Sequence, residues 1–304
     1  MTPDALALSA PGASEPRWLD PQLYPFASRY IEIEGQRLHY VDVGTGETIL
    51  FVHGTPSWSF EWRAQVQELS QHCRCIALDH LGFGLSDKPQ HGAYKPEDHA
   101  QRLVRFVRAL DLHAVTLVVH DFGGPIGLGA ALVEPARFAR LVVLNTWLWS
   151  LSERPAVRRI SGFVRSALGR FLYRFLNFSP RVLLPAAFAV RKRLSRSVHR
   201  HYLAPFSSWR ERTAPWVLGC ELAGSGAFYD SLWQRRSQWP ELAAIIWGMR
   251  DPALESALLA QLEAAFPTAA VTRIADAGHF PQEEAAQTVT DALRRALTKQ
   301  RPSA

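Results

Sequence analysis

The sequence predicts an α/β fold, in which a mostly parallel sheet of eight strands is flanked by helices and carries an inserted helical cap. Short apolar runs alternate with segments whose apolar residues recur at helical spacing. This alternation is typical of parallel strands joined by crossover helices. It stops between residues 147 and 239, where the chain is rich in Arg, Phe and Leu. We therefore expect a core from residues 1–146 and 240–304, and a helical cap from residues 147–239.

The individual elements follow from composition and spacing. The first two expected strands flank Gly35 and indicate a hairpin. The second expected helix begins with Pro96 and two acids, as helix N-termini do. Strands are expected at residues 30–33, 38–43, 48–52, 75–78, 115–119, 141–144, 244–247 and 271–274, and helices at 61–69, 96–110, 123–132 and 283–299. Residues 1–16, rich in Pro, Ala and Ser, are expected to form a loose arm without a signal peptide.

Composition excludes several classes of protein. The chain of 304 residues is 47% hydrophobic and 20% charged, as ordinary folded proteins are, and no apolar run is long enough for a transmembrane helix. Its three cysteines, Cys73, Cys75 and Cys220, form no CxxC pair and no cluster with metal-ligand spacing. We therefore expect free thiols, no metal or other cofactor, no integral membrane segment and a cytoplasmic location. The sequence does not specify an oligomeric state.

Positive charge is concentrated in the expected cap. Residues 153–212 contain fourteen Arg or Lys and two acids, a net charge of +12, so the rest of the chain carries −6 of the total +6. Such a segment could contact a nucleic acid or an anionic membrane. However, its arginines are interleaved with apolar residues such as Phe163 and Phe171 at helical spacing. We therefore expect amphipathic cap helices with solvated basic faces and no nucleic-acid partner.

One segment places an acid at a sharp corner between a strand and a helix. In Val118–Gly124, the expected strand runs directly into the expected helix, with Asp121 at the junction. The nucleophilic Ser of the G-x-S-x-G elbow occupies this position. Gly123 and Gly124 keep the backbone slim there. Taken alone, Asp121 could equally be an ordinary acid favoured by the dipole of a helix N-terminus.

Three further segments indicate catalysis. Thr55 lies in HGTP after a strand, Asp251 ends WGMRD after a late strand, and His279 lies in DAGHF after the next strand. The chain order of nucleophile, acid and histidine is that of the α/β-hydrolase fold, whose oxyanion hole draws one N–H from a loop at the HGTP position. Together these segments predict a catalytic triad of Asp121, Asp251 and His279.

The same segments resemble those of the haloalkane dehalogenases. Over residues 26–150 and 240–295, the motifs HGTPSWSFEWR, DHLGFGLSDKP, VVHDFGGPIGL, WGMRD and DAGHF are similar to motifs of that family. The resemblance implies Asp121 as nucleophile, His279 as base and Asp251 as its orienting acid. Some members carry the acid after an earlier strand. That position is Asn145 in this chain, which has no negative charge, and this favours Asp251.

The resemblance also implies the oxyanion hole, which backbone N–H groups of Thr55 and Phe122 would form. In the family, a Trp directly after the nucleophile holds the leaving halide, whereas Phe122 has no N–H on its ring. The second halide donor is usually an Asn in HGxP or a cap Trp, but Thr55 replaces the Asn and residues 150–208 contain no Trp. Trp147 or Trp149 is the candidate substitute.

A carboxylate nucleophile selects a particular chemistry. Because Asp121 is ionised near neutral pH, it can attack a saturated carbon without losing a proton, leaving an alkyl ester that His279 hydrolyses through water. The substrate is then a small apolar electrophile, and we expect cleavage of carbon–halogen bonds. One alternative is an epoxide hydrolase, with Tyr173 and Tyr202 of the cap as acidic hydroxyls. Others are a β-lactone decarboxylase, whose cap motifs resemble residues 201–209, and a non-catalytic binding protein.

Overall fold

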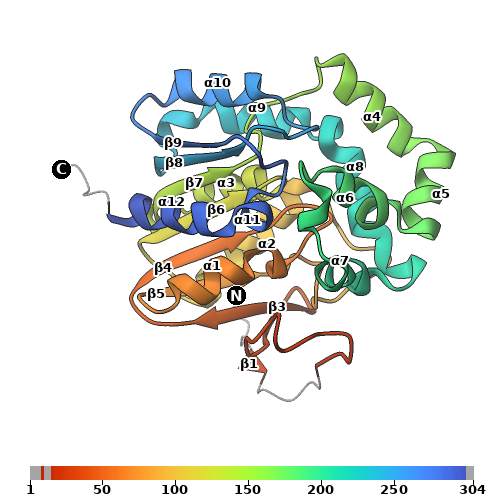
Figure 1. The fold of residues 1–304 in the computed structure, drawn as a ribbon, viewed down its shortest axis with the longest axis horizontal. Coiled ribbons are helices and arrows are strands. Elements are labelled where there is room, and N and C mark those ends of the chain that lie inside the picture. The colour runs from red at the N-terminus through yellow and green to blue at the C-terminus, as the bar shows by residue number, and fades with distance from the viewer. Residues whose placement is uncertain (1–7, 10–14, 299–304) are drawn as a thin grey trace, which may run out of the picture.

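A twisted sheet lies between helices on both of its faces (Figure 1) in the computed structural model, which describes residues 8–9 and 15–298. Its strands follow the order β1-β2-β3-β5-β4-β6-β7-β8-β9. The three pairings from β1 to β5 are antiparallel, and the other five are parallel. The strands are β1 (Leu8–Ser9), β2 (Arg29–Ile33), β3 (Gln36–Val43), β4 (Glu47–Val52), β5 (Cys73–Leu78), β6 (Val115–His120), β7 (Phe138–Leu144), β8 (Glu241–Gly248) and β9 (Ala270–Ile274).

Strands β2 to β9 are the eight that the sequence predicts, so the predicted α/β-hydrolase fold is confirmed. The prediction of a loose arm is wrong at Leu8–Ser9, because these two residues form β1 and pair with β2. Most of the arm, residues 1–7 and 10–14, lies outside the described residues. No helix among the described residues is long and apolar enough to cross a membrane.

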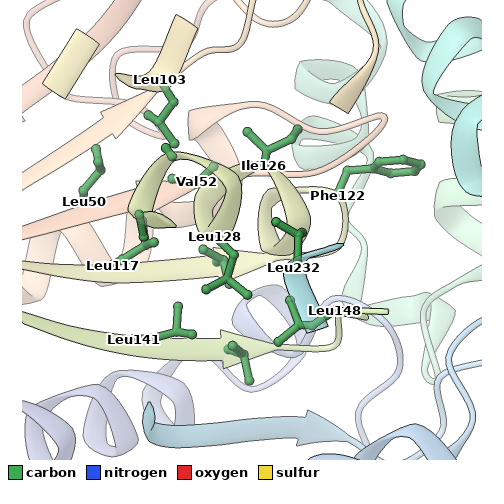
Figure 2. Packing of buried hydrophobic residues seen from close by; sticks show 14 of the residues in the cluster. Leu50, Val52, Leu103, Leu117, Phe122, Ile126, Leu128, Leu141, Leu148 and Leu232 are labelled. Atoms are coloured by element: carbon green, nitrogen blue, oxygen red, sulfur yellow. The ribbon is translucent and has the colours of Figure 1, made fainter. Parts of the chain in front are cut away.

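The core forms two apolar layers, one on each face of the sheet. In β6, Leu117 and Val119 contribute to one layer and Val118 to the other, because successive strand residues point to opposite faces. Helices α2, α3 and α10 cover the first face, and α1 and α12 cover the second. Figure 2 shows α3 lying over β6 and β7, with Phe122 extending away from this packing at the N-terminal end of the helix.

The core helices differ from the predictions at two places. α10 was not predicted, because three of the five exposed positions of this helix are alanines rather than the polar residues that mark a solvent face. The predicted C-terminal helix is interrupted at Ala285, and its last residue, Lys299, lies outside the described residues. The core helices are α1 (Arg63–Leu69), α2 (Pro96–Ala109), α3 (Gly123–Val133), α10 (Ser256–Ala265), α11 (Pro281–Glu284) and α12 (Ala286–Thr298).

The chain between β7 and β8, which the structure describes in full, contains helices and no strand. α4 packs closely against α8, and both precede β8 in the chain. The α-helices of this segment are α4 (Pro155–Arg165), α5 (Ala167–Leu176), α6 (Leu184–Ala186), α7 (Arg196–Leu203), α8 (Thr213–Gly224) and α9 (Gly226–Gln234).

The outer faces of α4 and α5 are not purely basic. Val157 and Val164 on α4 and Tyr173 on α5 are buried, as an amphipathic helix requires. Large apolar side chains on the same helices are nevertheless exposed beside the arginines, for example Phe163 and Leu168. The outer faces of these helices are therefore both basic and apolar.

The tight approach of α3 to β4 yields a stability prediction. A Cβ at Gly123 would collide with the backbone of Val52, whereas a Cβ at the exposed helical Gly162 would meet nothing. We expect Gly123→Ala to lower the free energy of unfolding by about 1–3 kcal/mol, because backbone must shift. Gly162→Ala, the matched control, should raise it by about 0.5–1 kcal/mol. Chemical denaturation followed by circular dichroism measures both, and equal stability of the two variants would contradict the packing described.

Candidate active site

The three predicted triad residues meet at the carboxyl ends of the parallel strands. Asp121 follows β6, Asp251 follows β8, and His279 follows β9. His279 Nδ1 lies 2.6 Å from Asp251 Oδ2, and His279 Nε2 lies 3.4 Å from Asp121 Oδ2. All three residues are buried. One imidazole therefore bridges two carboxylates, at the edge of the sheet where open α/β folds place their ligands.

A strained backbone presents the Asp121 carboxylate. The residue has a φ of +51°, in the left-handed region that side chains other than glycine rarely adopt. Its N–H donates to the Asn145 carbonyl at 3.1 Å, and its carbonyl accepts from the Thr146 hydroxyl at 2.6 Å. A Cβ at Gly54 would collide with the carboxylate itself. Glycine next to Thr55 therefore leaves the space that the Asp121 side chain fills.

Thr55 donates its backbone N–H to Asp121 Oδ1 at 2.8 Å. The loop that carries Thr55 is fixed by His53, whose ring lies 2.7 Å from the Gly54 carbonyl through Nδ1 and accepts the His80 N–H through Nε2. Burial lowers the pKa of His53, which keeps the ring neutral and makes Nδ1 the donor. Phe122 is the N-cap residue of α3, where backbone N–H groups lack partners within the helix.

Asn145 has a role that sequence reasoning missed. Its side-chain amide donates to Asp251 Oδ2 at 2.8 Å, and its own oxygen accepts the Gly248 N–H at 2.8 Å. Asp251 Oδ1 also accepts the N–H groups of Ala253 and Leu254. Burial alone would raise the pKa of Asp251, but the charge of His279 and these hydrogen bonds outweigh it and lower the pKa. Asn145 thus hydrogen-bonds to Asp251 from the strand-end position that was considered above as the alternative position of the acid.

The His279 imidazole lies in the field of both carboxylates. Burial alone would lower the pKa of His279, but the negative charge of Asp251, and then hydrogen bonds and charge from Asp121 and Asp251, raise the pKa well above its usual value. This raised pKa favours the protonated form of the ring, the imidazolium. If Asp121 loses its negative charge, the imidazolium loses part of this electrostatic stabilisation, and the pKa of His279 falls.

A second buried pair, also missed from the sequence, supports the backbone of His279. His120 Nε2 lies 2.7 Å from the His279 carbonyl, and His120 Nδ1 lies 3.3 Å from both oxygens of Glu61. Glu61 and His120 have fully buried side chains. Glu284 reinforces the same loop by accepting the N–H of Gly278 at 2.6 Å. The one available hint was an acid between two aromatic residues in the run SFEW, since buried acids are rare unless paired.

The predicted substrate-binding residues lie in different surroundings. Trp147 is buried, packs edge-on against Phe122 with ring centroids 4.7 Å apart, and has no hydrogen-bond partner for Nε1 among the described residues. Burial raises the pKa of Tyr173 to about 12, and the charges of Cys220 and Asp121 add to this rise. The Tyr202 hydroxyl instead donates to Glu283, so the structure does not place it with the triad.

These charges lead to a prediction about His279. Replacing Asp121 by Asn removes one negative charge beside the ring, so the imidazolium loses support and the pKa of His279 should fall. NMR titration of ¹⁵N-labelled histidine measures this pKa, with a His279→Gln spectrum to assign the resonance. Asp276→Asn is the matched control, because that exposed acid pairs with Arg193 and should leave the pKa unchanged. A His279 pKa that is the same in Asp121→Asn would rule out the coupling.

The comparisons with known proteins agree with this geometry. Residues 47–286 match the model of the alpha/beta hydrolase fold family. Haloalkane dehalogenase 2 of Mycobacterium tuberculosis is 32% identical over 277 residues, which are 90% of this chain and 96% of that protein. A cis-3-alkyl-4-alkyloxetan-2-one decarboxylase of Shewanella oneidensis is 33% identical, over 91% of this chain and 90% of the other.

A solved structure is also similar. The haloalkane dehalogenase DatA from Agrobacterium tumefaciens C58 superposes with a TM-score of 0.77 at 26% identity, covering 89% of this chain and 95% of that one. Family model, relatives and structure therefore agree, and the predicted resemblance is confirmed. The chain belongs to the α/β-hydrolase family, as a hydrolase of the haloalkane dehalogenase type.

Proposed function

We propose that the protein hydrolyses carbon–halogen bonds of small apolar substrates through an alkyl ester on Asp121. The observation that carries the proposal is the unequal environment of the two Asp121 oxygens. Oδ1 accepts the Thr55 N–H at 2.8 Å, whereas Oδ2 faces His279 Nε2 at the longer distance of 3.4 Å. Oδ1 is thus suited to become the carbonyl oxygen of an ester, and Oδ2 to attack carbon.

In the first step, Asp121 Oδ2 forms a bond to the substrate carbon, and the electrons of the carbon–halogen bond leave with the halide. No proton moves, so this step does not require His279 as a base. The ester has no charge on Asp121. Because that charge is one of the causes of the raised pKa of His279, ester formation lowers the pKa and favours the neutral imidazole.

In the second step, neutral His279 Nε2 takes a proton from water, and the hydroxide adds to the ester carbon of Asp121. The negative charge then develops on Oδ1, where the Thr55 N–H stabilises it, with the Phe122 N–H as the proposed second donor. Collapse releases the alcohol, which receives the proton, and restores the carboxylate. Asp251 holds the imidazole in orientation and stabilises its positive charge.

The leaving halide needs a donor that Phe122 cannot supply. Trp147 is the proposed donor, because its buried Nε1 has no partner among the described residues and its ring contacts Phe122. A buried N–H without a partner is costly, which makes a ligand on it favourable. The Thr55 hydroxyl is a second buried group for which the described residues offer no partner. The two groups together support an anion site beside the nucleophile.

Residues 147–239 are proposed to form a cap domain whose inner face bounds the substrate site. We assign Tyr173 to this face, because Tyr173 is buried while Phe171 and Phe175 of the same helix are exposed, and the charge of Asp121 contributes to its raised pKa. An epoxide hydrolase would use two tyrosine hydroxyls of the cap, but the hydroxyl of Tyr202 donates a hydrogen bond to Glu283. This arrangement favours halides over epoxides. The free thiols of Cys73, Cys75 and Cys220 support a cytoplasmic location.

A second candidate is decarboxylation of a β-lactone. The relative of Shewanella oneidensis acts on cis-3-alkyl-4-alkyloxetan-2-ones by its name, and it matches this chain at 33% identity. A strained lactone has an electrophilic carbon that a carboxylate can attack, and its product is an alkene with CO₂. Assaying CO₂ from a lactone and halide from alkyl bromides with the same preparation separates the two candidates.

The covalent step is tested by blocking the second step. In a His279→Phe variant treated with a reactive alkyl bromide, we expect one alkyl group to remain on the peptide that contains Asp121, as mass spectrometry would show. Steady-state turnover should fall by about 10²–10⁴-fold, the range for loss of a general base. The matched control is His279→Phe with Asp121→Asn, which should carry no added mass. An unmodified Asp121 peptide in the single variant would refute the ester.

The leaving-group donor is tested on a series of alkyl halides. Trp147→Phe keeps an aromatic ring but removes the N–H, so the single-turnover release of chloride should slow by roughly 10- to 100-fold, as for a hydrogen bond to a charged group. Iodide release should slow less, because iodide is a weaker acceptor. Trp149→Phe is the control, because that buried ring packs against Trp233. Equal slowing in both variants would contradict the assignment.

A further inference from the structure

Most of the large apolar side chains that are exposed among the described residues lie in the segment between β7 and β8. Of the ten large apolar side chains that are exposed among the described residues, nine lie between Ile160 and Trp209. Their exposed fractions range from 41% to 58%. Figure 1 shows α4 and α5, which carry several of them, at an outer edge of the molecule. A patch of this kind marks an interaction surface.

The patch is built from side chains in mutual contact. Phe171 and Phe175, one helical turn apart on α5, stack with centroids 5.4 Å apart, and Phe175 stacks on Trp209 at 5.9 Å. Trp209 begins the short helix η6 (Trp209–Arg212), and two arginine side chains, Arg174 and Arg210, lie over its ring. The exposed aromatic row is therefore continuous, and it is bordered by cations.

The surroundings of the row are strongly basic. Residues 153–212 carry a net charge of +12, and Arg158, Arg159 and Arg170 are exposed on α4 and α5 beside the apolar side chains. Apolar side chains surrounded by arginines on helices that lie along a surface are the pattern of interfacial membrane-binding segments. We call the surface made by Ile160, Phe163, Leu168, Phe171, Phe175 and Trp209 the outer cap face.

We propose that the outer cap face binds the surface of a bilayer that contains anionic lipid. The charge distribution selects this partner. A second copy of the chain would bring two strongly positive faces together, which like-charge repulsion opposes. A nucleic acid would satisfy the arginines but would leave aliphatic side chains such as Ile160 and Leu168 exposed to water or to phosphates. An anionic membrane satisfies both, with charged headgroups for the arginines and acyl chains for the apolar residues.

The same helix connects this surface with the proposed site. On α5, Phe171 and Phe175 point outward, whereas Tyr173 is buried on the opposite side, within the electrostatic reach of Asp121. Apolar substrates concentrate in membranes, so docking through the outer cap face would bring the cap to their source. The binding itself does not rest on the proposed function, because it can be measured without turnover.

Vesicle co-sedimentation tests the proposal. The full-length protein should sediment with vesicles of phosphatidylcholine mixed with phosphatidylglycerol in equal parts, and should remain in solution with phosphatidylcholine alone. Arg158→Gln with Arg159→Gln should weaken partitioning roughly 30-fold, at about fivefold for each arginine. Phe171→Ser with Phe175→Ser should weaken it by at least about tenfold, because apolar area no longer enters the bilayer. Both pairs are exposed, so the variants should fold, which circular dichroism verifies.

Matched controls remove the same chemistry elsewhere. Among the described residues, Val133→Ser changes the one large exposed apolar side chain that lies outside the segment, and Arg105→Gln with Arg108→Gln removes the same charge from α2. Both controls should bind vesicles as the parent does. Equal loss in these controls, or no binding to the anionic vesicles, would overturn the proposal. A concentration-dependent dimer that the Phe171 and Phe175 changes abolish, without vesicle binding, would assign the face to a second copy instead.

Discussion

The left-handed backbone corner at Asp121 is the constraint on which the site depends. A non-glycine residue held there costs of order 1–3 kcal/mol and persists only where its surroundings fix it. Here the neighbouring strand end provides the fixing groups, through the Asn145 carbonyl and the Thr146 hydroxyl. Glycines at positions 54 and 123 provide the space. The corner aims the carboxylate out of the sheet, and the rest of the site is arranged around it.

Asp121 and Asp251 have the same side chain, but they differ in the number of hydrogen-bond donors around the carboxylate. The carboxylate of Asp251 accepts from Asn145, from the imidazole and from two backbone N–H groups, so its lone pairs are fully engaged. Asp121 has one short bond, to Thr55, and a long contact with His279. A carboxylate with few donors is the better nucleophile, and one with many is the better fixed anion. Environment rather than residue type separates their parts in the proposed reaction.

The sequence predicted what local patterns encode. Eight strands were identifiable from apolar alternation, and strand-end motifs indicated which side chains meet at one edge of the sheet. α10 was missed because alanines occupy three of the five exposed positions on its solvent side. Glu61 and Asn145 were missed as supporting groups because their partners are more than fifty residues away in the chain. No local sequence pattern predicts hydrogen-bonded pairs that are so far apart in the chain. The exposure of the apolar side chains on one face of α5 could not be predicted for a similar reason. Helical periodicity identifies apolar faces of a helix, but it does not show which of them the rest of the protein buries.

Glu284 joins the loop that carries His279 to the segment between β7 and β8. Its carboxylate accepts the N–H of Gly278 together with those of Ala189 and Val190, and the His279 N–H donates to the Ala187 carbonyl at 2.9 Å. Residues 187–190 are therefore held against the loop that carries His279, since displacing them would break these hydrogen bonds. Any movement of residues 187–190 would therefore also move the backbone that orients the His279 ring.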